Sequence, residues 1–230
     1  PRNVAAITFT NKAAKEMQER IGKLLSRSTA EELQISTFHS LGVRMVREDG
    51  QVLGLKPQFS ILDADDVTGI IKDAAGGTAD AATARQWQWT ISLWKNMGLN
   101  AEQALAQAQN DHERSIAVIM QHYEERLTAY QSVDFDDLIG MPMRLLKNHP
   151  EVREKWQRLL GHVLVDEYQD TNATQYELLK LLVGEKGHFT AVGDDDQSIY
   201  GWRGATLDNL KKLPVDYPQL KIIKREQNYR

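Results

Sequence analysis

Two adjacent carboxylates follow a strongly apolar stretch of the chain. In HVLVDEYQD (162–170), residues 163–165 are typical of a buried strand, and Asp166 and Glu167 come directly after them. Ligands of open parallel sheets bind beyond the carboxyl ends of the strands. There, one carboxylate could hold a divalent cation through its water shell and the other could accept a proton from an attacking water, as in hydrolysis of an Mg-nucleotide. Taken alone, however, the pair is more typical of a solvated strand end that caps the next helix.

A second stretch repeats this design. In FTAVGDDDQSIYGWRGA (189–205), an apolar strand is followed by a glycine, three acids and Gln197, which could bond a terminal phosphate or its attacking water. Tyr200, Trp202 and Arg203 follow within six residues, with neither a helical nor a strand period. Exposed aromatic rings beside an arginine are suited to stacking on the bases of single-stranded nucleic acid.

Alternating strands and helices must position these side chains. The pattern at both ends of the chain is β-α-β-α, which favours a parallel sheet with crossover helices. Strands are expected at 4–9, 33–38, 59–62, 162–167, 189–193 and 220–226. Helices are expected after Thr10, over 40–48, after Asp63, after Thr83, over 116–130, 137–147, 150–160, 174–183 and 206–213.

The middle of the chain does not alternate between strands and helices. Residues 50–131 are almost entirely helical in pattern, so we predict an inserted helical accessory subdomain there. Residues 1–49 and 132–230 would then form a single α/β domain. The stripe of Trp87, Ile91 and Trp94 in the insert is more typical of a core than of a ligand site.

The composition excludes several classes of site. The chain has 230 residues, 41% of them hydrophobic and 26% charged, with a net charge of −4, so no overall basic character indicates nucleic acid. Cysteine is absent, which excludes disulfides and cysteine-ligated metals and fits a reducing cytoplasm. No apolar run approaches the length of a membrane helix, and no membrane partner is expected.

Six stretches together resemble one family. AITFTNKAAKEM, ISTFHSLG, DFDDL, VLVDEYQDTN, VGDDDQSIYGWRGA and EQNYR are similar, in order and spacing, to the motifs of superfamily 1 DNA helicases of the UvrD/Rep/PcrA type. VDEYQDTN and YELLKLLVG are the most Rep-like. The resemblance implies a RecA-like parallel sheet with flanking helices, of the P-loop NTPase type, carrying an inserted all-helical subdomain. It also implies an ATP-dependent 3′-to-5′ helicase and translocase that acts in replication or repair.

The resemblance implies roles for individual residues. Asp166 would coordinate Mg²⁺, Glu167 would activate the water that attacks the γ-phosphate of ATP, and Gln197 would sense that phosphate. Tyr229 would stack on the adenine and Arg230 would contact the γ-phosphate. Single-stranded DNA would be contacted by Thr8, Phe9, Thr10, Thr37, His39, Tyr200, Trp202 and Arg203. The DFDDL block would be mostly structural, and the insert would lie near the junction of single- and double-stranded DNA.

The chain also departs from the family pattern. No glycine-rich loop ending in Gly-Lys-Thr or Gly-Lys-Ser occurs in it, and Arg225 stands where an apolar residue would continue a strand. Both ends lie beside strands, so we interpret the chain as an internal fragment. The resemblance implies that the phosphate loop lies upstream of Pro1 and that a second RecA-like domain lies beyond Arg230. The isolated chain is therefore expected to be inactive.

Two alternatives differ in their requirements. A metal-dependent nuclease using Asp166, Glu167 and the acids at 194–196 would need a third ligand that the spacing does not supply. A non-enzymatic DNA-binding module would need no phosphate loop. Replication or repair proteins are further possible partners.

Overall fold

A parallel sheet lies at the centre of the α/β part of the molecule. The computed structural model describes residues 2–194 and 208–224. Within them, one sheet has the strand order β2-β1-β5-β6, all parallel. Its strands are β1 (Val4–Thr8), β2 (Gln34–Thr37), β5 (His162–Val165) and β6 (Phe189–Ala191). Ile7 lies opposite Val165, and Val165 lies opposite Ala191, so the carboxyl ends of these strands meet at one edge.

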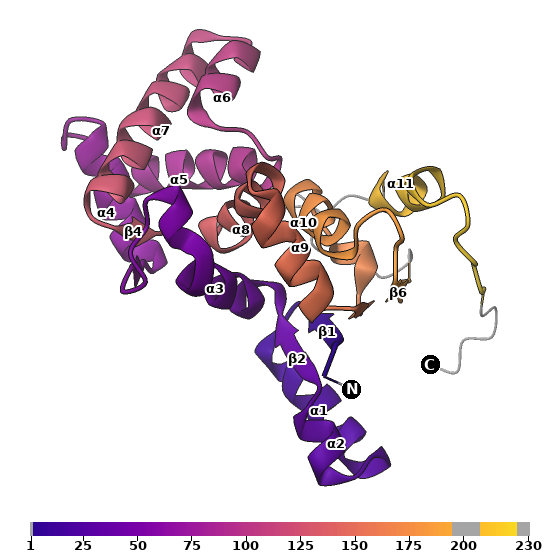
Figure 1. Cartoon of the computed structure of the whole chain (residues 1–230). Helices are drawn as coiled ribbons and strands as arrows, with labels where there is room; N and C mark the ends of the chain where they lie inside the picture. The colour runs from indigo at the N-terminus through magenta and orange to yellow at the C-terminus, as the bar shows by residue number, and fades with distance from the viewer. Residues whose placement is uncertain (1, 195–207, 225–230) are drawn as a thin grey trace.

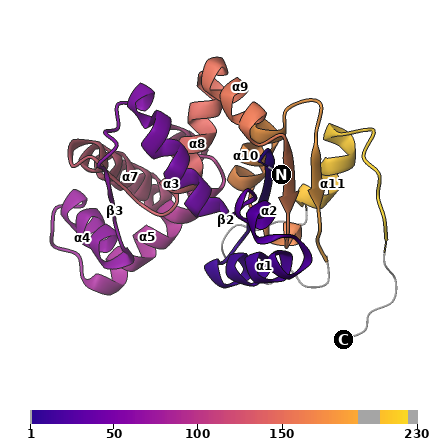
Figure 2. The same cartoon turned by 60° about the horizontal axis from the view of Figure 1, so that its bottom comes forward.

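Helices enclose this sheet. The helices of the α/β part are α1 (Asn11–Leu24), α2 (Arg27–Glu31), α3 (Phe38–Asp49), α8 (Asp137–Asn148), α9 (Pro150–Leu159), α10 (Ala173–Val183) and α11 (Asp208–Asp216), with short 3-10 helices at Gly50–Leu53 and Tyr168–Asp170. Side chains of α3, α8, α9 and α10 share one core with β1 and β5, centred on residues such as Met45, Trp156 and Leu178. β1 is buried from Ala5 to Thr8, as expected for the interior of a parallel sheet. Figure 2 shows α1 and α2 beside β2, at the opposite end of the sheet from α11.

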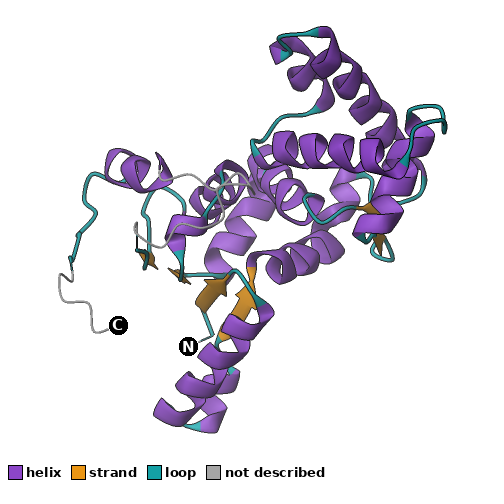
Figure 3. Ribbon diagram, turned by 180° about the vertical axis from the view of Figure 1, so that it is seen from behind, coloured by secondary structure: helices purple, strands orange, loops and turns teal. Residues whose placement is uncertain are grey.

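The insert has a core of its own. Its elements are β3 (Ser60–Ile61), α4 (Ala64–Ala74), α5 (Ala81–Asn96), α6 (Ala101–Gln107) and α7 (Asp111–Ala129), and β3 pairs in parallel with β4 (Ser132–Val133). Ile71, Ile91, Met120 and Leu127 pack together inside it, with Trp87 and Trp94 against them. Figures 1 and 3 show these helices gathered at one end of the molecule, away from the four-stranded sheet.

The fold differs from the sequence-based expectation in several places, and the helices α2 and α6 were not predicted. Residues 220–224 form no strand, and Ile222 and Ile223 are exposed because no neighbouring strand pairs with them. Asp80, not Thr83, caps α5, since its carboxylate accepts a bond from the Thr83 amide. β5 ends at Val165, two residues early. Tyr130, expected on the α7 stripe, is exposed beyond the end of that helix.

Several other boundaries follow the local signals. Thr10 caps α1, Asp63 caps α4, and Pro150 occupies the first turn of α9. Gly98 lies just beyond α5 with a φ of +80°, a conformation that glycine adopts at little cost. Within the described part of the chain, no helix combines the length and apolarity needed to span a bilayer.

Candidate functional site

The acidic pair lies at the carboxyl edge of the sheet. The amide of Asp166 donates to the Ile7 carbonyl over 3.1 Å, which continues the β1–β5 ladder one residue past the strand. Asp166 is half-buried and its Oδ1 accepts a bond from the Glu167 amide over 2.9 Å. Asp166 thus lies beside the carboxyl end of β1, close to Thr8.

Glu167 has an unusual backbone. Its φ of 53° and ψ of 42° are left-handed, a region that residues other than glycine rarely occupy and that recurs at functional sites. Side chains alternate between the two faces of the sheet only as far as the end of β5. The direction of the exposed Glu167 side chain is therefore set by the turn that follows the strand. Gln169 Nε2 donates to Glu167 Oε2 over 2.6 Å and holds the carboxylate in place.

Gln169 also joins two strand ends. It is 1% exposed, and its Oε1 accepts a bond from the Asp194 amide over 3.0 Å. A Cβ on Gly193 would lie 3.0 Å from that oxygen, so a side chain there would crowd the contact. The buried amide of Gln169 therefore links the residues that follow β5 and β6. Sequence reasoning did not identify this residue as part of the site.

The predicted nucleic-acid residues at the β1 and β2 ends differ in exposure. Thr8 and Thr37 are buried, and their hydroxyls bond the Thr10 carbonyl and Ser40 Oγ respectively. Thr10 and Thr37 also cap α1 and α3 through their hydroxyls. The structure thus gives both caps a local structural role. Phe9 packs against Phe38, with ring centroids 5.4 Å apart, and remains partly exposed.

Phe135 is a site candidate that sequence reasoning missed. Its ring is 60% exposed and stacks on His39, with centroids 4.3 Å apart and planes inclined by 29°. Asp134 and Asp137 exchange backbone-to-carboxylate bonds across it, so the turn holds this ring outward. In the sequence, Phe135 is an apolar residue with acids on both sides. In the structure, Asp134 and Asp137 are buried and the Phe135 ring is exposed, which is the reverse of the usual pattern.

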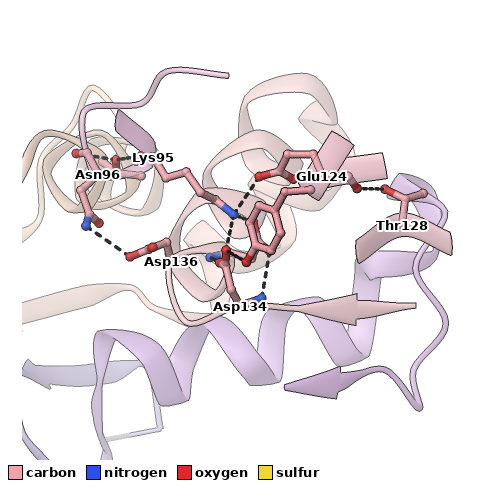
Figure 4. A network of polar contacts seen from close by, with 9 residues as sticks. Lys95, Asn96, Glu124, Thr128, Asp134 and Asp136 are labelled. Carbon is pink, nitrogen blue, oxygen red and sulfur yellow. Dashed lines mark hydrogen bonds and ion pairs between the residues drawn. The ribbon is translucent and has the colours of Figure 1, made fainter. Parts of the chain in front are cut away.

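Lys95 binds three carboxylates where α5 meets the α/β part. Its ammonium lies 2.7 Å from Asp134, 2.8 Å from Asp137 and 3.0 Å from Glu124, and the Tyr123 hydroxyl donates to Asp134 over 2.7 Å. We call these five residues the Lys95 cluster, of which Figure 4 labels Lys95, Glu124 and Asp134. The lysine and both aspartates are less than a tenth exposed. The block expected to be mostly structural therefore supplies a buried ion network.

Burial and charge set the protonation of this cluster. Burial alone would lower the pKa of Lys95, but the carboxylates of Asp134, Asp137 and Glu124 outweigh it and raise that pKa well above its usual value. Burial, reinforced by the Asp134 carboxylate, raises the pKa of Asp137 to about 7. The same two causes raise the pKa of Asp136 to about 6. Burial opposes the shift at Asp134, but Lys95 holds its pKa below the usual value.

The end of α5 is also tied to the segment that follows the acidic pair. Asn96 Nδ2 donates to Asp136 over 3.2 Å, and Asn172 Nδ2 donates to the Asn96 side chain over 3.1 Å. The Thr174 hydroxyl lies 3.1 and 2.9 Å from the carbonyls of Lys95 and Asn96. Asn172 caps α10, five residues after Glu167. The insert thus contacts both the Phe135 turn and the loop that carries the acidic pair.

Several predicted site residues lie outside the described ranges. These are Gln197, Tyr200, Trp202, Arg203, Tyr229 and Arg230. Over residues 2–194 and 208–224, no three histidine, aspartate or glutamate side chains gather as a metal site. A single carboxylate at Asp166 nevertheless fits Mg²⁺, which keeps several waters and binds through one or two carboxylates together with substrate phosphates.

Comparison with known proteins identifies a family. The UvrD/REP helicase N-terminal domain family matches residues 1–218. The chain is 49% identical over its full length to the ATP-dependent DNA helicase Rep of Escherichia coli and 48% identical to Rep of Salmonella typhimurium, covering 34% of each. It is 42% identical over its full length to the ATP-dependent DNA helicase PcrA of Staphylococcus aureus, covering 32% of that protein. The chain thus spans about a third of the length of these relatives.

Proposed function

Because the chain belongs to the UvrD/REP helicase N-terminal domain family, we propose that it is part of an ATP-dependent DNA helicase and translocase. The protein would bind single-stranded DNA and couple hydrolysis of Mg-ATP to 3′-to-5′ unwinding in replication or repair. The relatives named Rep and PcrA are ATP-dependent DNA helicases, and their likeness extends over the whole chain. Its sheet and flanking helices are the RecA-like fold of that family.

We propose two parts for this chain. Residues 1–49 and 132–230 would form the RecA-like ATPase domain, and residues 50–131 the accessory subdomain near the DNA junction. The separate hydrophobic core around Ile71 and Met120 supports this division. Ion pairs and amide contacts at the end of α5 would keep the two parts in a fixed relation.

The nucleotide would be hydrolysed at the edge where β5 and β6 end. Asp166 would hold Mg²⁺, which neutralises charge on the phosphates when bound. Glu167 would accept a proton from the attacking water, and Gln169 would orient its carboxylate through the 2.6 Å bond. Gln197 and Arg230 would contact the terminal phosphate and Tyr229 would stack on the adenine.

Single-stranded DNA would lie along the ends of β1 and β2. Phe9, Thr10 and His39 would contact it, with the buried Thr8 and Thr37 beside them, joined by Tyr200, Trp202 and Arg203. Phe135 is added to this set, because its exposed ring continues the His39 stack. The observation that carries the proposal is that the acidic pair and this track share one edge of the sheet, joined by the bond from Asp166 to Ile7. A short path therefore connects hydrolysis with DNA contact.

The substitution Glu167→Gln in the full-length protein tests the assignment. Loss of a general base costs about 10²–10⁴-fold in rate, so phosphate release should fall by at least 100-fold while binding of a fluorescent ATP analogue stays near wild type. Glu185→Gln, an exposed residue at the other end of the sheet, is the matched control and should leave both unchanged. Normal turnover by the Glu167 variant would show that this carboxylate is not the base.

A further inference from the structure

A cavity separates the insert from the strand ends. It has a volume of about 560 Å³, and its α/β wall includes Phe9, His39 and Phe135. The opposite wall is formed by α4 and α5 of the insert. The proposed DNA track therefore has a second side, to which no role has been assigned.

One face of α5 lines this cavity. Trp89, Ser92 and Asn96 follow one another at steps of three and four residues, which places them on the same side of the helix. Trp89 is 55% exposed, whereas Trp87 and Trp94 pack against the insert core. Trp87 and Trp94 therefore belong to the insert core and Trp89 does not. The exposed ring of Trp89 is accessible from the cavity, where it could stack on a planar ligand.

The end of α5 fixes this face relative to Phe135. Asn96 donates to Asp136, the residue after Phe135, and Thr174 bonds the last carbonyls of the helix. Trp89 lies two helical turns before Asn96. These hydrogen bonds fix the side of the cavity that carries Trp89 relative to the side that carries Phe135. Both rings therefore already line the same cavity.

The lining selects the kind of ligand. Among the described lining residues there is no lysine or arginine, whereas Asp136 and Asp170 contribute carboxylates and Gln88 and Gln175 contribute amides. Such a lining disfavours phosphate, whose recognition relies on cationic groups. It is suited to a nucleobase, since aromatic rings stack on its faces and carboxylates and amides accept from its N–H groups.

We propose that the cavity receives an unstacked base of the single strand, and that Trp89 contacts that base from the insert side. The phosphates would remain outside the cavity. This inference rests on the proposed binding of single-stranded DNA and extends that contact from the α/β part to the insert.

The test uses the full-length protein and a single-stranded oligonucleotide at several salt concentrations. Trp89→Ala should weaken binding at least about fivefold, as expected for one lost stacking contact. The slope of log affinity against log salt should stay unchanged, because tryptophan neutralises no phosphate. Trp89→Phe should recover part of the affinity. Tyr130→Ala, an exposed aromatic of the insert outside the cavity lining, should bind like wild type.

Phe9→Ala separates this inference from the proposed function. If Phe9→Ala weakens binding and Trp89→Ala does not, the base contact from the insert is wrong while the track on the strand ends stands. If neither variant changes affinity, the track itself is wrong. A changed salt slope for Trp89→Ala would also overturn the inference, since it would indicate lost phosphate contacts.

Discussion

At the scale of single residues, Glu167 has a backbone conformation typical of glycine and a side chain that glycine lacks. The left-handed backbone would suit glycine, but the proposed chemistry needs a carboxylate. Two bonds hold the residue there: its amide donates to Asp166, and Gln169 donates to its carboxylate. The side chain of Gln169 is buried, so its bond fixes the orientation of the proposed base without a bound nucleotide.

The second residue-scale feature is the raised pKa of Asp137 in the Lys95 cluster. Burial and the Asp134 carboxylate raise the pKa of Asp137 from 3.8 to about 7, so the folded chain holds this proton more tightly than the unfolded chain does. The resulting stability is present in full below about pH 4 and is lost as the pH rises through about 7. Asp136, with a pKa of about 6, acts in the same direction, while Asp134 acts oppositely at lower pH.

We therefore predict that Asp137→Asn flattens the pH dependence of stability. The wild-type chain should lose unfolding free energy between about pH 4 and about pH 7, on the order of 1 kcal/mol for each unit by which the pKa is raised. The variant lacks the titrating group, so its loss over that range should be smaller, whatever its absolute stability. Thermal unfolding of both chains across this range provides the comparison. Parallel curves would mean that Asp137 does not titrate there.

At the scale of elements, α3 and α8 approach closely at Gly42. A Cβ at this position would lie 1.7 Å from the Leu138 carbonyl oxygen, which belongs to the backbone of α8. α3 carries His39 near its start, and α8 begins just after Phe135. The close crossing therefore brings together the two rings that stack at 4.3 Å.

Gly42→Ala should separate these helices. The clash is with backbone, so we predict a loss of about 1–3 kcal/mol or more in stability and weaker single-strand binding as the His39–Phe135 stack opens. Gly22→Ala is the matched control, because Gly22 is exposed in α1 with nothing within 4 Å of the added atom. That control should stabilise the chain by about 0.5–1 kcal/mol. Equal melting temperatures for the two variants would refute the role of the close crossing.

The elements also show which features the sequence could predict. Thr10, Asp63 and Pro150 begin helices through contacts within a few residues, and the pattern reveals such contacts. The Lys95–Asp134 pair spans 39 residues, and the Thr174–Lys95 contact spans 79. Such pairs depend on the packed fold, so Lys95 and Phe135 were not predicted. The strand expected at 220–226 needed a neighbouring strand, which local pattern could not supply for residues 220–224.

At the scale of the whole molecule, the two proposed activities share a single edge of the sheet. The acidic pair follows β5, and the residues proposed to contact bases follow β1 and β2. The insert covers the same side through α5. Asn172 ties α5 to the loop that begins at the acidic pair. Movement of that loop during hydrolysis would therefore reach the insert and the DNA track together, without a long relay through the core.

The 230-residue chain contains only part of the proposed nucleotide site. The chain contains Asp166 and Glu167 but no Gly-Lys-Thr or Gly-Lys-Ser loop to bind the phosphates. Charge that develops on a transferring phosphoryl group needs several cationic groups at once, and a single arginine finger contributes about 10³–10⁵-fold. The 230-residue chain alone should therefore release phosphate from ATP at least about a thousandfold more slowly than the full-length protein. A phosphate-release assay with and without single-stranded DNA measures both. Robust turnover by the chain alone would mean that its own side chains bind the triphosphate in a way the acidic edge of the sheet does not explain.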